Sequence, residues 1–365
     1  MPLALLLVVL MVPGVARAQG WGRVKQADKF VQKMGENLKK QSNLRFGDLE
    51  EALWAVASIA KMRGLGIVQG YGNNMFRPNS SVKQCEALAM MVRAFDLEDE
   101  AQELANQLGV PYSAKAGDDE DVASVQVNGK LYPFVPASSR WALGYVLMAV
   151  EQGWVKLSEC NPQAPATRAW VSKVMVHALG HESQAQAKMN AALPFLDASS
   201  VPADSVGYVA EAVAIGLFQG YDDGTFQPQK PVTRAEMATI LDRFLGQELP
   251  TMPYLATGTV QSVGTNTLAV KTPAGDVLNY TVSADALVIV DGKPSTLANV
   301  KAGDVVEVLS NGSGTALLVT VKKHGTVPPS SNQVTGTIVA IADPPAITLS
   351  ITGQPNRTIS VASNC

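Results

Sequence analysis

The chain is poor in the residues from which catalytic and metal-binding sites are most often built. Its 365 residues include three cysteines and three histidines, too few for a disulfide scaffold, a zinc ribbon or most histidine-dependent chemistry. Lysine and arginine number 29 against 32 aspartates and glutamates, so no net positive field exists to hold a phosphate backbone. We expect no nucleic-acid partner and no cofactor, and no catalytic set of residues is evident.

Long apolar runs are equally scarce. Residues 3–12 form one, followed by Pro13-Gly14 and then by Ala16-Arg17-Ala18, the small-x-small pattern that signal peptidase accepts. A membrane-spanning helix needs about 20 apolar residues, and this run is much shorter. We therefore expect cleavage after Ala18, a secreted chain and no membrane span after signal cleavage.

The composition changes near residue 246. Before it, Ala, Leu, Met, Glu and Gln recur at helical spacing, and after it Val, Thr, Ile and Gly form short alternating runs. We therefore expect a multidomain protein with an all-α front half followed by all-β modules.

The front half contains an internal repeat. Three segments share a glycine, a loop, a proline and a five-residue motif, which reads VKQCE, ATRAW and VTRAE in residues 66–86, 153–170 and 216–236. The loops of the first and last copies read GIVQGYGNNMF and GLFQGYDDGTF. Trp54, Trp141 and Asp204 occupy equivalent positions, because each precedes the first glycine of its copy by the same number of residues.

Each copy predicts a helix, a turn and a second helix. Thr233 and Glu236 form a T-x-x-E capping box, and the apolar residues after it recur every three or four positions, as on one helix face. The other two copies keep this stripe. Because one such helix pair cannot bury its own apolar face, we expect the three stripes to face one another in a three-helix-bundle core.

The pattern Trp-Ala, Gly-Ile or Gly-Leu, GY-x-DG-x-F, Pro and VTRAE resembles that of S-layer homology (SLH) repeats, over residues 46–246 as a triplet. The resemblance implies a pseudo-trimer that anchors a surface protein noncovalently to the cell wall. Its inter-repeat grooves would bind a secondary cell-wall polysaccharide, with a pyruvate ketal as the epitope. The arginine of TRAE is the family's contact residue, which implies Arg234 and Arg168 here.

These two arginines also stand out on physical grounds. Each lies in the first turn of its helix, at the positive end of the macrodipole, where a cation is mildly unfavourable. We therefore expect neither to serve folding. A guanidinium beside free amides at a helix N-terminus makes a carboxylate site. The alternative is a capping box with a solvated arginine.

The copies do not match the pattern equally. Copy one has Lys83-Gln84-Cys85 in place of Thr-Arg-Ala, and copy two has Trp170, a stacking surface, in place of Glu. We expect one or two competent grooves, the best of them in copy three. The candidate glycan-binding residues are Arg234, Arg168, Thr233, Thr167, Glu236, Trp170, Tyr221, Gly220, Tyr71, Gly70, Trp54 and Trp141.

The few histidines and cysteines form no evident site. His177 and His181 stand four apart on a predicted helix, a metal-ligand spacing, but no third ligand is evident and we expect no metal. Cys85 and Cys160 replace apolar positions of the repeat, which predicts buried free thiols. Cys365 ends the chain.

An insertion separates copies one and two. We expect a short amphipathic helix over 98–108, a solvated acidic run over 118–121 and a hairpin over 125–132 that turns at Asn128-Gly129.

The tail predicts six short strands separated by Gly, Asn or Asp turns, hence a small closed barrel or sandwich. They cover residues 258–260, 267–270, 277–282, 286–290, 305–309 and 316–321. A second such module opens after a Pro/Ser linker and stops at about half a barrel. Half a barrel leaves an unpaired strand edge, so we expect the natural chain to continue or this half to pair with a partner.

The predicted domains are 1–18 signal peptide, 19–45 N-terminal helical segment, 46–96 repeat 1, 97–136 insertion, 137–181 repeat 2, 182–246 connecting helix and repeat 3, 247–256 linker, 257–324 β-barrel module, 325–334 Pro/Ser linker and 335–365 partial second β module. We expect a wall anchor and not an enzyme, with the polysaccharide and other S-layer subunits as partners. Two alternatives remain open: an anchored hydrolase whose catalytic domain lies beyond Cys365, and a β-module adhesin.

Overall fold

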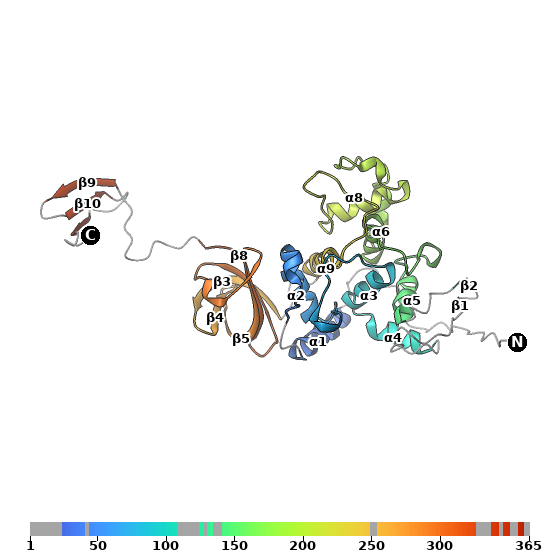
Figure 1. Cartoon of the computed structure of the whole chain (residues 1–365), viewed down its shortest axis with the longest axis horizontal. Coiled ribbons are helices and arrows are strands. Elements are labelled where there is room, and N and C mark those ends of the chain that lie inside the picture. The colour runs from blue at the N-terminus through green and yellow to red at the C-terminus, as the bar shows by residue number, and fades with distance from the viewer. Residues whose placement is uncertain are drawn as a thin grey trace.

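A computed structural model describes most of the chain (Figure 1). The described residues are 24–40, 44–107, 124–127, 130–133, 141–248, 254–325, 337–342, 346–350 and 357–360. The expected signal peptide, the acidic run and the turn at Asn128-Gly129 lie outside these ranges. Helices dominate up to residue 248 and strands dominate after residue 254, as the change in composition predicts. None of the described helices is long and apolar enough to cross a bilayer.

The elements follow the predicted order. The helices are α1 (Val24–Lys40), α2 (Val56–Gly64), α3 (Gln84–Ala94), α4 (Glu98–Gln107), α5 (Leu143–Glu151), α6 (Arg168–Ala178), α7 (Glu182–Ala187), α8 (Val206–Ala214) and α9 (Arg234–Glu248), with a 3₁₀ turn η1 (Leu49–Ala55) before α2. The strands are β1 (Ser124–Val127), β2 (Lys130–Pro133), β3 (Leu255–Val263), β4 (Thr267–Lys271), β5 (Val277–Val290), β6 (Lys293–Ser295), β7 (Val305–Ser310), β8 (Thr315–Lys323), β9 (Thr337–Ala342), β10 (Ala346–Ser350) and β11 (Arg357–Ser360).

A ring of backbone hydrogen bonds joins the three copies. Val82 N donates to Val232 O at 2.9 Å, Val232 N donates to Ala166 O at 2.8 Å, and Ala166 N donates to Val82 O at 2.9 Å. Each copy therefore donates to one neighbour and accepts from the other. The ring places the start of each copy's second helix, α3, α6 or α9, beside the loop of another copy.

The helices pack across copies. The second helix of copy one (α3) packs on α5, that of copy two (α6) on α8, and that of copy three (α9) on α2, so each contacts the first helix of the next copy in the ring. The expected packing, in which the stripes of α3, α6 and α9 chiefly face one another, is not the main one. The first helices are themselves rich in buried apolar residues, and they cover the stripes.

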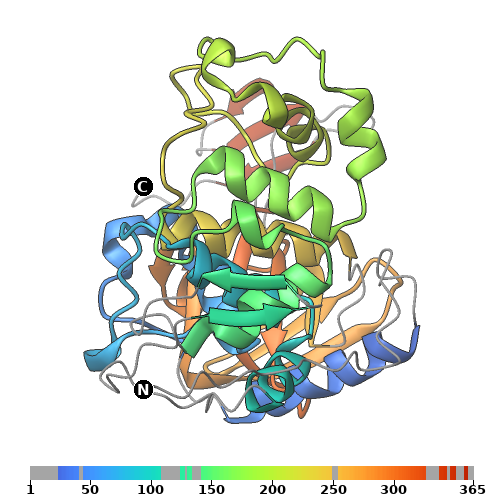
Figure 2. The same ribbon diagram turned by 90° about the vertical axis from the view of Figure 1, so that its right-hand side faces the viewer.

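The described part of the insertion contains the expected helix and the two strands of the expected hairpin. Helix α4 packs on α5, and β1 pairs with β2 in an antiparallel hairpin whose register joins Val127 to Lys130. Figure 2, turned by 90° from Figure 1, brings this hairpin to the front and keeps the segment from α6 to α8 at the top.

The first β module is a closed barrel. The strand order is β4-β3-β7-β8-β5-β6, and an additional β4–β5 pairing closes the sheet. Strand β5 runs through residues 277–290, so two predicted strands are one, and β5 pairs in parallel with β8. Asp291 and Gly292 form a two-residue hairpin turn with φ of 52° and 72°, the conformation that Asp-Gly favours.

The barrel packs against the helical part. Lys61 of α2, only 4% exposed, contacts Asp242 Oδ1 of α9 at 2.8 Å and Glu307 Oε1 of β7 at 2.9 Å. Leu309 of the barrel belongs to the same buried apolar cluster as the helices. The second β module comprises a three-stranded antiparallel sheet in the order β11-β10-β9.

Candidate functional site

The loop of copy one is held by Asp48. Its Oδ1 accepts a hydrogen bond from Phe76 N at 2.8 Å and its Oδ2 accepts one from Arg77 N at 2.6 Å. Arg77 has φ of 59°, a left-handed conformation that costs a non-glycine residue free energy. The two hydrogen bonds to the buried carboxylate therefore offset the cost of this conformation and fix the end of the loop.

Asp197 does the same in copy three. It accepts from Phe226 N and Gln227 N, both at 2.8 Å, and Gln227 has φ of 57°. The two loops are thus built in the same way, although their sequences differ at several positions.

Phenylalanine rings explain why each loop needs a glycine. The ring of Phe46 lies against Gly70, where a Cβ would come within 2.3 Å of Phe46 Cε1. Phe195 lies in the same way against Gly220, where a Cβ would come within 2.7 Å of Phe195 Cε1. A side chain at either position would collide with the phenylalanine ring and displace the loop from it.

Arg234 reaches from copy three into the loop of copy one. Its Nε donates to Phe76 O at 2.8 Å and its Nη2 donates to Gln69 O at 2.6 Å. The guanidinium carbon lies 4.8 Å from the Tyr71 ring centroid and 4.5 Å from that of Phe76. Arg234 thus serves the loop of another copy and not its own.

Arg168 makes the matching contacts from copy two into the loop of copy three. Its Nε donates to Phe226 O and its Nη2 donates to Gln219 O, both at 2.7 Å. The guanidinium carbon lies 4.5 Å from the Tyr221 ring centroid. The two arginines therefore sit in equivalent sites.

The helix amides beside these arginines are not free, which corrects the expectation from the sequence. Arg234 N donates to Ser80 O and Ala235 N donates to Pro78 O, and the corresponding amides of α6 donate to Lys230 and Pro228 carbonyls. A ligand carboxylate can therefore accept hydrogen bonds from the guanidinium but not from these first-turn amides, which already donate to carbonyl oxygens.

The arginines are buried cations that make no close ion pair, although Glu236 acts electrostatically on Arg168 and Glu86 on Arg234. Arg168 is 5% exposed and Arg234 is 7% exposed, and burial lowers the pKa of both guanidinium groups. Within the described residues, neither forms an ion pair with a carboxylate. The expectation that they do not serve folding is wrong, because each satisfies two carbonyl oxygens of a neighbouring loop.

A cavity of about 280 Å³ opens beside Arg234. Its walls come from the copy-one loop, from α3 and from copy two. They are lined by Val68, Gln69, Gly70, Tyr71, Glu86, Ala89, Met90, Arg93, Trp141 and Arg234. Four of the predicted residues, Gly70, Tyr71, Trp141 and Arg234, therefore meet in one groove between copies.

The equivalent site at Arg168 is shaped by Tyr221 and Glu236. Tyr221 Oη donates to Glu236 Oε1 at 2.6 Å, and Glu236 Oε2 accepts from Thr233 N at 2.8 Å. The second half of the predicted capping box is present too, since Glu236 N donates to Thr233 Oγ1 at 3.2 Å. Burial, and next the bond to Glu236, raise the pKa of Tyr221, so the phenol stays a donor.

The groove of copy two is larger, about 840 Å³, and lacks a guanidinium. Gln84 occupies the arginine position and accepts from Asn161 N at 2.9 Å. Thr167 and Trp170 line this groove, so Trp170 and Arg168, two residues apart in one motif, face different grooves. Thr167 caps α6 by accepting from Trp170 N at 3.3 Å.

Trp54 stands on η1, at the position that corresponds to Trp141 of copy two. It is 61% exposed on η1, and η1 packs on α9.

His177 and His181 do not share a helix. Helix α6 ends at Ala178 and Gly180 turns the chain with φ of 72°. His181 Nδ1 then lies 2.8 Å from Glu211 Oε1. The i, i+4 spacing therefore places no pair of ligands on one face, which corrects the helical placement. Cys85 and Cys160, buried and partly buried, form no disulfide within the described residues.

Sequence reasoning missed Asp48 and Asp197, together with the phenylalanine two residues before each. The signal was present, since both loops are preceded by Phe-x-Asp at nearly the same distance. It lies outside the TRAE motif and could be recognised only after the two copies are superposed.

Comparison with known proteins supports the repeat. Residues 45–88 and 194–238 match the S-layer homology domain. A cellulosome-anchoring protein of Acetivibrio thermocellus is 38% identical over 87 residues, 23% of this chain and 19% of that protein. A surface-layer 125 kDa protein of Lysinibacillus sphaericus is 23% identical over 193 residues, 52% of this chain and 14% of that protein. An endoglucanase of Bacillus sp. strain KSM-635 is 22% identical over 212 residues, 57% of this chain and 19% of that protein.

The chain spans less than a fifth of the length of each of these relatives. The two matched segments are copies one and three, which contain the Asp48 and Asp197 loops, and copy two lies between them. The chain therefore carries S-layer homology domains, and the matches support a secreted protein associated with the cell wall.

Proposed function

We propose that the protein is held noncovalently on the cell wall by a secondary wall polysaccharide that bears pyruvate ketals. The observation that carries this proposal is the pair of buried arginines, Arg234 and Arg168, neither of which has a carboxylate within ion-pair distance among the described residues. A buried cation gains most from a counter-charge that is also desolvated. The carboxylate of a bound ketal supplies one.

The groove at Arg234 fits such a ligand. A ketal fused to a sugar presents one carboxylate and an apolar face. The cavity offers the guanidinium of Arg234 together with Tyr71 and Trp141 along its wall, whereas the other arginine of the lining, Arg93, is paired with Glu98. Arginine pairs with a planar carboxylate through parallel hydrogen bonds, and aromatic rings stack on the apolar faces of sugars.

We further propose that copy two, residues 137–181, is a diverged third repeat and that the three form a pseudo-trimer. In the ring of hydrogen bonds, Val82, Ala166 and Val232 each donate one backbone bond and accept one, so the three copies make equivalent contacts. Because Gln84 replaces the arginine that would face copy two, two of the three grooves are competent for an anion.

The hydrolase names among the relatives fit the same role. The endoglucanase match covers 57% of this chain but 19% of that enzyme, and an amylopullulanase of Thermoanaerobacterium thermosulfurigenes is matched over 54% of this chain and 9% of its own length. We propose that the shared part is the anchor and that this chain is not itself an enzyme.

Co-sedimentation of the full chain with purified cell walls tests the proposal. The protein should bind native walls and lose most binding when pyruvate is removed by mild acid. Arg234→Gln and Arg168→Gln should each weaken binding by about tenfold, the value of one charge-assisted hydrogen bond. Glutamine is already accommodated at this position as Gln84, and Gln84→Ala is the matched control. Equal binding to native and depyruvylated walls would rule out the carboxylate mechanism.

A further inference from the structure

A second cavity lies beside the Arg234 groove. It has a volume of about 400 Å³, and it shares with that groove the lining residues Val68, Gln69, Gly70 and Tyr71. The four-residue loop 68–71 is therefore a wall common to both cavities. A chain of sugars leaving the Arg234 groove over this loop would enter the second cavity next.

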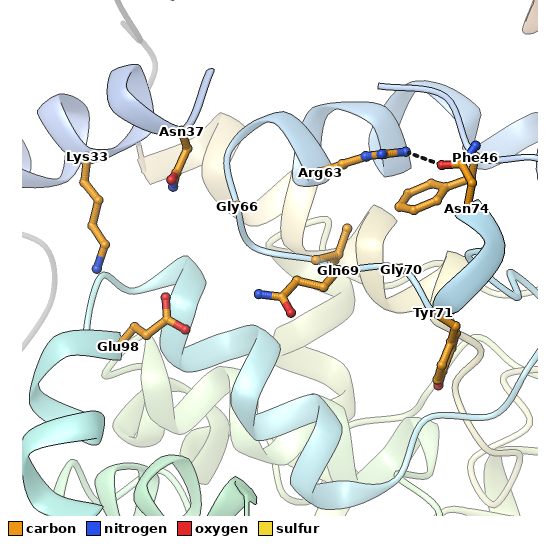
Figure 3. A pocket seen from close by; sticks show the side chains of 11 residues that line it. Lys33, Asn37, Phe46, Arg63, Gly66, Gln69, Gly70, Tyr71, Asn74 and Glu98 are labelled. Atoms are coloured by element: carbon orange, nitrogen blue, oxygen red, sulfur yellow. Dashed lines mark hydrogen bonds between the residues drawn. The ribbon is translucent and has the colours of Figure 1, made fainter. Parts of the chain in front are cut away.

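The other walls lie partly outside the segment that matches the S-layer homology domain. Lys33 and Asn37 come from α1, and Glu98 begins α4, whereas Arg63 is in α2. Figure 3 shows Lys33 and Glu98 at one end of the cavity, Phe46 and Tyr71 at the other, and Gln69 between them. This chain thus adds its own residues to the repeat at this point.

Arg63 is the charge in this cavity that lacks a counter-charge. Its guanidinium carbon lies 4.0 Å from the centroid of the Phe46 ring, and its Nη1 donates to Arg45 O at 2.5 Å and to Asn74 Oδ1 at 3.3 Å. It forms no ion pair within the residues that the structure describes. These contacts hold the guanidinium in one orientation before any ligand binds.

The other charged groups of the cavity are already paired. Lys33 Nζ lies 2.9 Å from Asp99 Oδ1, and Glu98 Oε1 accepts from Arg93 Nε at 2.8 Å and from Tyr145 Oη at 2.7 Å. Lys33 Nζ also lies 4.0 Å from Asp96 Oδ1. Arg63 is therefore the cation of the cavity lining that can offer a ligand anion its charge.

The remaining polar groups are side-chain amides. Asn37, Gln69 and Asn74 line the cavity, and Asn37 uses its amide nitrogen to donate to Leu65 O at 3.2 Å. Amides both donate and accept, which suits sugar hydroxyls that do the same. Amides, two aromatic rings and one unpaired guanidinium are the chemistry that receives an acidic sugar residue.

The arginine belongs to copy one alone. The equivalent positions in copies two and three are Val150 and Val213, each three residues before the copy's first glycine, as Arg63 is before Gly66. Valine is therefore compatible with this position in the repeat, and the cationic cavity is a feature added to a single copy.

We propose that this cavity is a second saccharide subsite, which takes the next anionic sugar unit of the same polymer that enters the Arg234 groove. The inference rests on the proposed function. Under this proposal, copy one binds more than one sugar unit of the polymer, and Arg63 contacts the second anionic group.

Calorimetric titration of the full chain with a pyruvylated disaccharide and a tetrasaccharide from the wall polymer tests the subsite. The wild-type protein should bind the longer fragment about tenfold more tightly. Arg63→Val should remove that gain and leave the disaccharide affinity unchanged, and Arg63→Lys should keep part of it. Lys39→Gln, which removes an exposed charge of α1 outside the cavity, is the matched control. Circular dichroism verifies that each variant is folded.

The outcomes separate this inference from the function on which it rests. Equal affinity for the two fragments in the wild-type protein, or a length-dependent gain that survives in Arg63→Val, overturns the subsite while the wall anchor stands. Loss of disaccharide binding in Arg63→Val also overturns it, because the residue then acts on the Arg234 groove. If the wild-type protein binds neither fragment, the anchor and the subsite fall together.

Discussion

Arg234 Nε donates to the carbonyl oxygen of Phe76, 158 residues earlier in the chain, at 2.8 Å. This bond ties the start of α9 in copy three to the loop of copy one, and Arg168 ties copy two to copy three in the same way. The residue that we propose as the ligand contact therefore also holds the wall of its own groove. Binding and folding are coupled at this side chain.

The first prediction follows from that coupling. Arg234→Ala leaves the carbonyls of Phe76 and Gln69 without their charged donor, and should lower the free energy of unfolding by about 2–4 kcal/mol. Arg234→Gln, which keeps a side-chain donor, should lose less. Urea unfolding followed by circular dichroism measures both. An unchanged midpoint for Arg234→Ala would mean that the guanidinium does not hold the loop.

The sequence identifies the three copies, but it does not reveal which copy's arginine contacts which copy's loop. The repeat pattern locates the copies' helices and loops, and it correctly marks Arg234 and Tyr71 as site residues that come together. It does not indicate which copy's loop each arginine contacts, and the ranking of copy three as the best site stays a prediction. Contacts between copies depend on how the helices pack, and nothing in a local motif encodes which copy supplies the loop.

The second prediction concerns Asp197. Asp197→Ala removes the acceptor of two amides, one of them at the left-handed Gln227, and should cost about 2–4 kcal/mol of stability. Asp222→Ala, in the same loop but exposed, should cost less than about 0.5 kcal/mol. Thermal unfolding of the two variants side by side is the measurement. Similar melting temperatures for both would contradict the assigned role.

Strand prediction succeeded where alternation and turns agree, and failed where a strand continues through a bend. Five of the six predicted strands lie within β3, β4, β5, β7 and β8, and the sixth, at 286–290, is the second half of β5. A register shift between Val282 and Leu287 on β8 marks the bend. Closure by the β4–β5 pairing is a long-range contact that neither strand's own sequence specifies.

The third prediction tests the contact between barrel and helices. Lys61→Met leaves Asp242 and Glu307 without their shared partner in a buried setting, and should cost about 3–5 kcal/mol. Lys322 pairs with the same Glu307 at 3.3 Å but is 46% exposed, so Lys322→Met should cost less than about 1 kcal/mol. Calorimetry would report both values. Two equal small losses would show that the barrel is not fixed through Lys61.

The last prediction concerns pH and His324, at the end of β8. Its Nδ1 lies 3.1 Å from Asp304 Oδ1 and its Nε2 lies 3.0 Å from Asp291 Oδ1. These hydrogen bonds raise the pKa of His324 above its ordinary value, so the protonated ring is favoured in the folded barrel. The stabilisation is fully present below about pH 6.5, the unfolded value, and is lost as pH rises through the higher folded pKa.

The wild-type protein should therefore lose stability relative to His324→Gln as pH rises above about 6.5 and through the higher folded pKa of His324. Asp304 contributes in the opposite direction only at lower pH, because its pKa is depressed in the folded chain, and its stabilisation disappears on acidification. Thermal melts of the two proteins across pH 5–9, with NMR titration of the His324 ring, measure the effect. Parallel pH profiles for the two proteins, or a His324 pKa at or below its ordinary value, would show that the two aspartates do not hold the ring in its charged form.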